Sequence, residues 1–165
     1  MPIAIAFLVV AAARGWFSFV AMSCMAGFLA LHVIGARYVY SFVPFGESLS
    51  VLSLGGDVAE RNHYDRLVHL LFGFLAMIPL VEAMDRFTTV TRGVACAAAL
   101  MTVIGLGALY EVFEWLLTIL VSPQDAERYN GQQGDPWDAQ KDMALAALGA
   151  AFALWPAAAR PTVRL

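Results

Sequence analysis

The chain has 165 residues, of which 61% are hydrophobic and only 14% are charged, against about 25% charged residues in an ordinary soluble domain. This composition excludes a conventional water-soluble globule, and the length allows one domain. The 10 Lys and Arg residues against 13 Asp and Glu residues give a net charge of -3, so no basic excess is available to neutralise phosphates and we expect no nucleic-acid partner.

Four apolar runs are long enough to cross about 30 Å of hydrocarbon as helices, which takes ~20 residues. We expect spans at residues 15–36, 62–82, 93–121 and 136–155. Residues 3–13 are apolar as well, but they reach only about half-way across and are interpreted as a half-inserted segment. A secretory signal is the alternative, although no basic region precedes this segment. The expected fold is all-α: one polytopic membrane domain over residues 1–165, with a bundle of four transmembrane helices plus a short N-terminal apolar segment.

Four spans place the end of the first, the start of the second, the end of the third and the start of the fourth on one side of the membrane. The ionisable residues at these four places are His32, Asp65, His69, Glu111, Glu114, Asp138 and Asp142. Pairs with i,i+3 or i,i+4 spacing project from one helix face. An ionisable group at mid-membrane costs roughly 2.5–3.5 kcal/mol and therefore faces the bundle interior. We expect these side chains to meet there.

Carboxylates gathered in one small volume repel one another, and three remedies are open. They take up protons, they pair with Arg61, Arg66 and Lys141, or they bind a cation. A set that mixes carboxylates with imidazole suits Zn, Mn or Fe, and with more oxygen ligands it suits Mg or Ca. The sequence therefore predicts a site for a divalent metal ion.

Structural roles compete with this interpretation. Asn62 and Asp135 are in position to cap the second and fourth helices, with Asp65 and Asp138 as acids of their first turns. Capping does not explain His69 or Asp142, which lie one turn deeper.

The remaining polar and aromatic residues have less specific explanations. His32 is equally well explained by snorkelling to the interface. For Glu111 and Glu114 the alternative is an internal ion pair with Arg66 or Lys141. We expect His63 at the surface and Trp115 as a wall of the acidic cluster. The residues at the other end of the second span are expected to be solvated: Glu82, Asp85 and Arg86.

Several strings resemble those of the YjdF-type family of bacterial inner membrane proteins. They include Arg61-Asn62-His63-Tyr64-Asp65-Arg66 with His69, Tyr110-Glu111 with Glu114-Trp115, and Trp137-Asp138-Ala139-Gln140-Lys141-Asp142. The resemblance covers about residues 31 to 155 and implies a multi-pass protein of the bacterial inner membrane, without supplying a reaction. The chain looks shorter at its amino terminus than these relatives. A looser similarity to the VanZ-like family follows the order Asp65-Arg66, His69, Glu111 and Asp138.

The leading hypothesis is a membrane enzyme that uses a divalent metal ion to hydrolyse or transfer the head group of a lipid or lipid-linked substrate. The preferred ligands are His69, Glu111, Glu114 and Asp142. Asp65 and Asp138 are further ligands or residues that orient the ligands, and His32 is another candidate ligand. Glu111, Glu114 and Asp65 are the candidate catalytic residues, and Arg61, Arg66 and Lys141 are the candidate head-group contacts. One alternative is a proton- or cation-coupled transporter with the same acids as a relay, for which a homodimer compensates for the small number of spans. Another is a non-catalytic accessory subunit.

Overall fold

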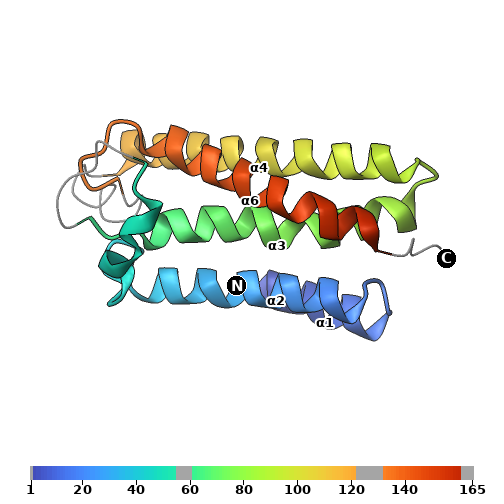
Figure 1. Ribbon diagram of the computed structural model, residues 1–165. Helices are drawn as coiled ribbons and strands as arrows, with labels where there is room; N and C mark the ends of the chain where they lie inside the picture. The colour runs from blue at the N-terminus through green and yellow to red at the C-terminus, as the bar shows by residue number, and fades with distance from the viewer. Residues whose placement is uncertain (1, 55–60, 122–131, 161–165) are drawn as a thin grey trace.

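The computed structural model describes residues 2–54, 61–121 and 132–160. In these ranges every regular element is a helix (Figure 1). In chain order the elements are α1 (Pro2–Ala13), α2 (Phe19–Arg37), the 3-10 helix η1 (Gly46–Leu52), α3 (Tyr64–Phe87), α4 (Arg92–Leu120) and α6 (Asp138–Ala159).

Four of the helices, α2, α3, α4 and α6, are long and apolar enough to cross a membrane. They have 19 to 29 residues and a mean hydropathy between 1.4 and 2.0 over their most apolar windows. The expected all-α fold with four candidate spans and a short N-terminal apolar helix is therefore confirmed. The bounds differ from the expected ones by a few residues, and α3 continues to Phe87, well beyond residue 82.

The helix starts show which residues act as caps. Ser18 caps α2, since its Oγ accepts a hydrogen bond from the backbone N of Ala21 at 3.2 Å. The prediction that Asn62 and Asp135 cap these helices is wrong. The cap positions of α3 and α6 are occupied by His63 and Trp137, one residue after Asn62 and two residues after Asp135. Asn62 and Asp135 instead accept backbone hydrogen bonds two residues on, as side chains of Asx turns do.

Helix α3 is the centre of the bundle and packs against α2, α4 and α6. Its most extensive contact is with α6, where two glycines permit close approach. A Cβ at Gly73 would collide with the carbonyl oxygen of Ala146, and one at Gly149 with the carbonyl oxygen of Leu70. Small residues of this kind let helix backbones approach closely in membranes. Among the described elements, α2 packs against α3 and α1 and makes no backbone contact with α4 or α6.

Helix α1 has 12 residues and is therefore about 18 Å long, roughly half the thickness of the hydrocarbon layer. It turns back along α2, and Figure 1 places the N-terminus about half-way along the bundle. Aromatic contacts near the turn include Phe7 with Trp16, whose ring centroids lie 6.4 Å apart. Partial insertion of α1 into the bilayer stays a prediction.

The end of the bundle beside the α1–α2 turn contains a buried polar cluster that corrects one expectation. Glu82 and Asp85 are 2% and 4% exposed, so they are not solvated. The Oε1 of Glu82 accepts a hydrogen bond from the Ser18 hydroxyl at 2.6 Å and lies 3.4 Å from Arg160 Nε, and Asp85 pairs with Arg92 at 2.5 Å. These contacts join the ends of α2, α3, α4 and α6. The expectation failed because each acid finds its partner on another helix.

Candidate functional site

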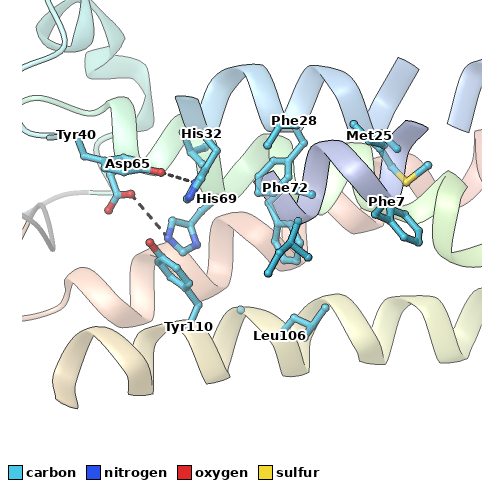
Figure 2. Close-up of a pocket in the computed structure, with 16 residues that line it drawn as sticks. Phe7, Met25, Phe28, His32, Tyr40, Asp65, His69, Phe72, Leu106 and Tyr110 are labelled. Carbon is cyan, nitrogen blue, oxygen red and sulfur yellow. Dashed lines mark hydrogen bonds and ion pairs between the residues drawn. The ribbon is translucent and has the colours of Figure 1, made fainter. Parts of the chain in front are cut away.

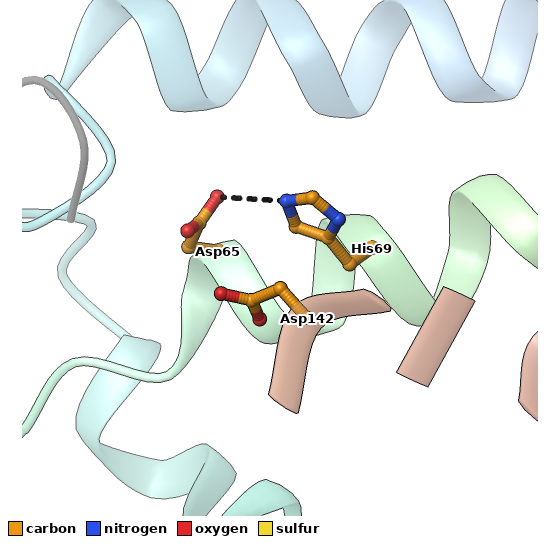
Figure 3. Close-up of side chains that lie close together, drawn as sticks. All are labelled: Asp65, His69 and Asp142. Carbon is orange, nitrogen blue, oxygen red and sulfur yellow. Dashed lines mark ion pairs between the residues drawn. The ribbon is translucent and has the colours of Figure 1, made fainter. Parts of the chain in front are cut away.

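Three side chains from two helices meet at the opposite end of the bundle (Figure 3). Asp65 and His69 lie one turn apart on α3, and Asp142 lies on α6 beside them. One potential ligand atom of each lies within 4.8 Å of the others. All three are buried, with Asp142 only 1% exposed. The arrangement depends on the close packing of α3 against α6 that Gly73 and Gly149 permit.

The imidazole of His69 is the centre of this group. Its Nε2 lies 3.9 Å from Oδ1 of Asp65 and 3.4 Å from Oε1 of Glu111, which enters from α4. Three buried carboxylate oxygens here have no hydrogen-bond partner among the described residues: Asp65 Oδ2, Glu111 Oε1 and Asp142 Oδ1. Leaving a buried polar atom without a partner costs about 1–3 kcal/mol, and more when it is charged. A bound cation or added protons would therefore stabilise this cluster of carboxylates.

Glu114 lies one turn beyond Glu111 on α4 and is also buried, at 6% exposure. It forms a side-chain hydrogen bond with Tyr110 on the same helix. It is not a member of the three-residue group described above. Trp115 was predicted to wall the cluster, but this is wrong: it is 59% exposed and lies on the outer face of α4. Adjacent residues on a helix point about 100° apart, so Glu114 and Trp115 do not face the same side.

The three basic residues predicted to contact a head group are engaged with acids at the start of α6. Arg61 pairs with Asp138 and also donates to the carbonyl oxygen of Gln132. Arg66, which is fully buried, lies 2.5 Å from Asp135, and Lys141 lies 2.7 Å from the same carboxylate oxygen. Asp138 is thus part of an ion-pair network. A role of these cations in substrate binding stays a prediction.

Asp135 and the residues around it are the structural feature that sequence reasoning missed. The Gln133 side chain bonds both the backbone N and the carbonyl oxygen of Asn62, at 2.8 and 2.9 Å. Asn62 in turn donates to the carbonyl oxygen of Val43 at 2.8 Å. These bonds join three segments that are far apart in the sequence, and His63 is buried among them at 5% exposure, so its predicted surface position is wrong. The available signal was the density of Asn, Gln and Asp beside two helix starts.

His32 lies across a cavity from His69 (Figure 2). Its Nδ1 is 2.5 Å from the hydroxyl of Tyr40, so the ring is held by a protein partner. His32 is not part of the Asp65, His69 and Asp142 group. The cavity has a volume of about 800 Å³, and both histidines and Asp65 lie at its polar end.

Comparisons with known proteins agree with the membrane architecture. The model of a family described as "Predicted membrane protein (DUF2238)" matches residues 1–162. The chain is 36% identical over 121 residues to the inner membrane protein YjdF of Escherichia coli (strain K12), an alignment that covers 72% of this chain and 54% of that protein. The chain thus spans about half the length of this curated relative. No solved structure matches. The predicted YjdF-type resemblance is confirmed, and the similarity to VanZ-like proteins stays a prediction.

Proposed function

The chain belongs to the DUF2238 family of membrane proteins, and from this premise we propose that it is a metal-dependent enzyme of the bacterial inner membrane. In this proposal it hydrolyses or transfers the head group of a lipid or lipid-linked substrate. The observation that carries the proposal is the meeting of Asp65, His69 and Asp142, two of which, Asp65 and His69, line the polar end of a cavity within the helix bundle.

The donor set fits a divalent ion. One imidazole and two carboxylates are a combination that suits Zn, Mn or Fe, and three protein ligands leave a position open for substrate, as in catalytic zinc sites. Two of the ligand residues, Asp65 and Asp142, have buried oxygens without a hydrogen-bond partner among the described residues. A divalent ion held there would polarise a phosphoryl or carbonyl oxygen of the substrate.

The distribution of charge supports a cation at this place. The basic residues are already paired with other acids: Arg61 forms an ion pair with Asp138, and Arg66 and Lys141 form ion pairs with Asp135. Asp65 and Glu111 have ion-pair contacts among the described residues only with His69, and Asp142 has none there within 4.0 Å. Like charges in a region of low dielectric repel strongly, and a bound cation is one of the ways to offset that repulsion.

In the proposed enzyme, the residues around the metal site have separate roles in proton transfer, exclusion of water and substrate binding. Glu111 lies 3.4 Å from the imidazole nitrogen and is the candidate to move a proton or to serve as a fourth ligand. The apolar walls of the cavity exclude water from the reacting group. Arg61 and Arg66 join the start of α3 to Asp138 and Asp135 by ion pairs, and an anionic head group is their candidate ligand.

A proton relay is the second candidate function. The specific observation in its favour is that two buried carboxyl groups, those of Asp65 and Glu111, lie 3.9 and 3.4 Å from the Nε2 of His69. Chains of intramembrane acids and histidines serve as proton pathways in pumps and transporters. In this case the buried carboxyl groups take up protons, and the purified protein contains no metal.

Metal analysis separates the two candidates. Protein purified in detergent is passed over a chelating resin, incubated with Zn, Mn or Fe in turn and analysed by plasma mass spectrometry. We expect one or two ions per chain, and loss of the metal in His69→Ala and Asp142→Asn. Glu82→Gln is the matched control, because it neutralises a buried acid at the other end of the bundle. Metal-free protein under all three conditions would refute the enzyme proposal.

A further inference from the structure

The cavity has a polar end and a long apolar part. The polar side chains that line it are His32, Tyr40, Asp65, His69 and Tyr110, and all lie toward one end. The apolar part runs along α2 from His32 to Met25 and along α3 from Asp65 to Phe72, and α1 contributes Phe7 at the far end (Figure 2). Seven residues of helix rise correspond to about 10 Å of depth.

The helix arrangement explains why this space exists. Helices α2 and α4 make no backbone contact, and the cavity separates them, with Phe28 on one wall and Leu106 on the other. A volume of about 800 Å³ falls within the range of about 300–1,000 Å³ for ligand pockets. Protein interiors are close-packed, and an apolar space of this size at membrane depth attracts the apolar molecules of the bilayer rather than water.

We propose that the cavity holds one hydrocarbon chain of a lipid substrate, with the chain end against α1 and the head group beside His69 and Asp65. The chain enters from the bilayer between α2 and α4. The match is one of shape and polarity, since an amphiphile has one polar end and one apolar chain, as the cavity has. The assignment of the head group to the metal site rests on the proposed function, whereas the place of the chain does not.

In this arrangement α1 sets the length of the chain that fits. Phe7 lies at the apolar end of the cavity (Figure 2), and its ring packs against Trp16 and Phe17. Ala4, one turn before Phe7, also lines the cavity. A larger side chain at residue 4 shortens the space, and a smaller one at residue 7 lengthens it.

The test uses the full chain in nanodiscs of phosphatidylethanolamine and phosphatidylglycerol. The probe is a lysophosphatidylglycerol whose acyl chain ends in a diazirine, and the sites of photo-cross-linking are mapped by mass spectrometry. We expect cross-links at Phe7 and Met25 to exceed those at Leu109 and Ile119, which lie on the exposed face of α4. Cross-links spread over the outer face in proportion to exposure would overturn the proposal.

Two variants measure the fit. Ala4→Trp is expected to lower cross-linking at Met25 about tenfold, the loss that displacing roughly two methylene groups from the cavity gives. Ala6→Trp is the matched control on the same helix, because Ala6 is exposed like Ala4 but does not line the cavity. Phe7→Ala is expected to shift the preferred probe to a longer acyl chain, and this readout stands if Ala4→Trp fails to fold. Equal cross-linking in Ala4→Trp and Ala6→Trp, or an unchanged chain preference in Phe7→Ala, would overturn the proposal.

Metal content measured on the same samples keeps the two proposals apart. A cross-linked cavity in protein without metal supports the chain position and refutes the metal-dependent enzyme. A metal-loaded protein that cross-links outside the cavity refutes the chain position and leaves the metal site standing.

Discussion

Replacing Asp142 by Asn has opposite effects on stability with and without metal if the proposed site is correct. The substitution keeps the shape of the side chain and removes one carboxylate from a group whose ligand atoms lie within 4.8 Å of one another. At that distance two ionised carboxylates repel by about 3.5 kcal/mol at an effective dielectric constant of about 20. Metal-free Asp142→Asn is therefore expected to be more stable than the metal-free parent, by up to about 3.5 kcal/mol.

With metal present the order reverses. The variant lacks one of three ligands, and even residues that only support ligands change metal affinity by about 10–100-fold when mutated. Each factor of ten corresponds to about 1.4 kcal/mol of lost stabilisation by the bound ion. The assay is thermal unfolding in detergent, followed by tryptophan fluorescence, with chelator and with saturating metal. Asp142→Asn that is destabilised equally under both conditions would refute a metal site at these residues.

Three further substitutions test the structure around the site. Gly149→Ala forces a methyl group against the backbone of α3 and is expected to cost about 1–3 kcal/mol of unfolding free energy, whereas Gly105→Ala, which meets open space, is expected to cost nothing. Asp135→Asn leaves the fully buried Arg66 without its nearest carboxylate and is expected to destabilise by about 3–5 kcal/mol. Glu82→Gln weakens charge-assisted hydrogen bonds between α2 and α3 and is expected to cost about 1.5–3 kcal/mol, with metal content unchanged. Denaturant unfolding in mixed micelles measures all three.

Each of these predictions has a clear contrary result. Equal stability of the two glycine variants would mean that α3 and α6 are not in close contact. An Asp135→Asn protein as stable as the parent would place Arg66 in water rather than in the bundle. Metal loss in Glu82→Gln would show that metal binding reports general stability rather than a local site.

The meeting of Asp65, His69, Glu111 and Asp142 was predictable because it follows from two properties of the sequence. Helical spacing places the second member of a pair on the face of the first, and the alternation of four spans places the polar parts of the helices at one end. The pairing of Arg61 and Arg66 with Asp138 and Asp135 was not predictable in the same way. It depends on which residues beside the starts of α3 and α6 meet in space, and no periodic pattern in the sequence encodes that meeting.

The amino-acid sequence by itself determined the number of spanning helices and the end at which Asp65, His69, Glu111 and Asp142 meet, because run length and helical period act along one chain segment at a time. The tertiary structure alone decided which neighbour each charge meets. Glu82 is buried because Ser18 and Arg160, distant in the sequence, lie beside it, whereas the described part of the chain leaves Trp115 exposed on α4. The cavity has the same origin, since it exists where α2 and α4 fail to touch. Contacts between helices depend on side-chain packing among several segments, and no single segment encodes them.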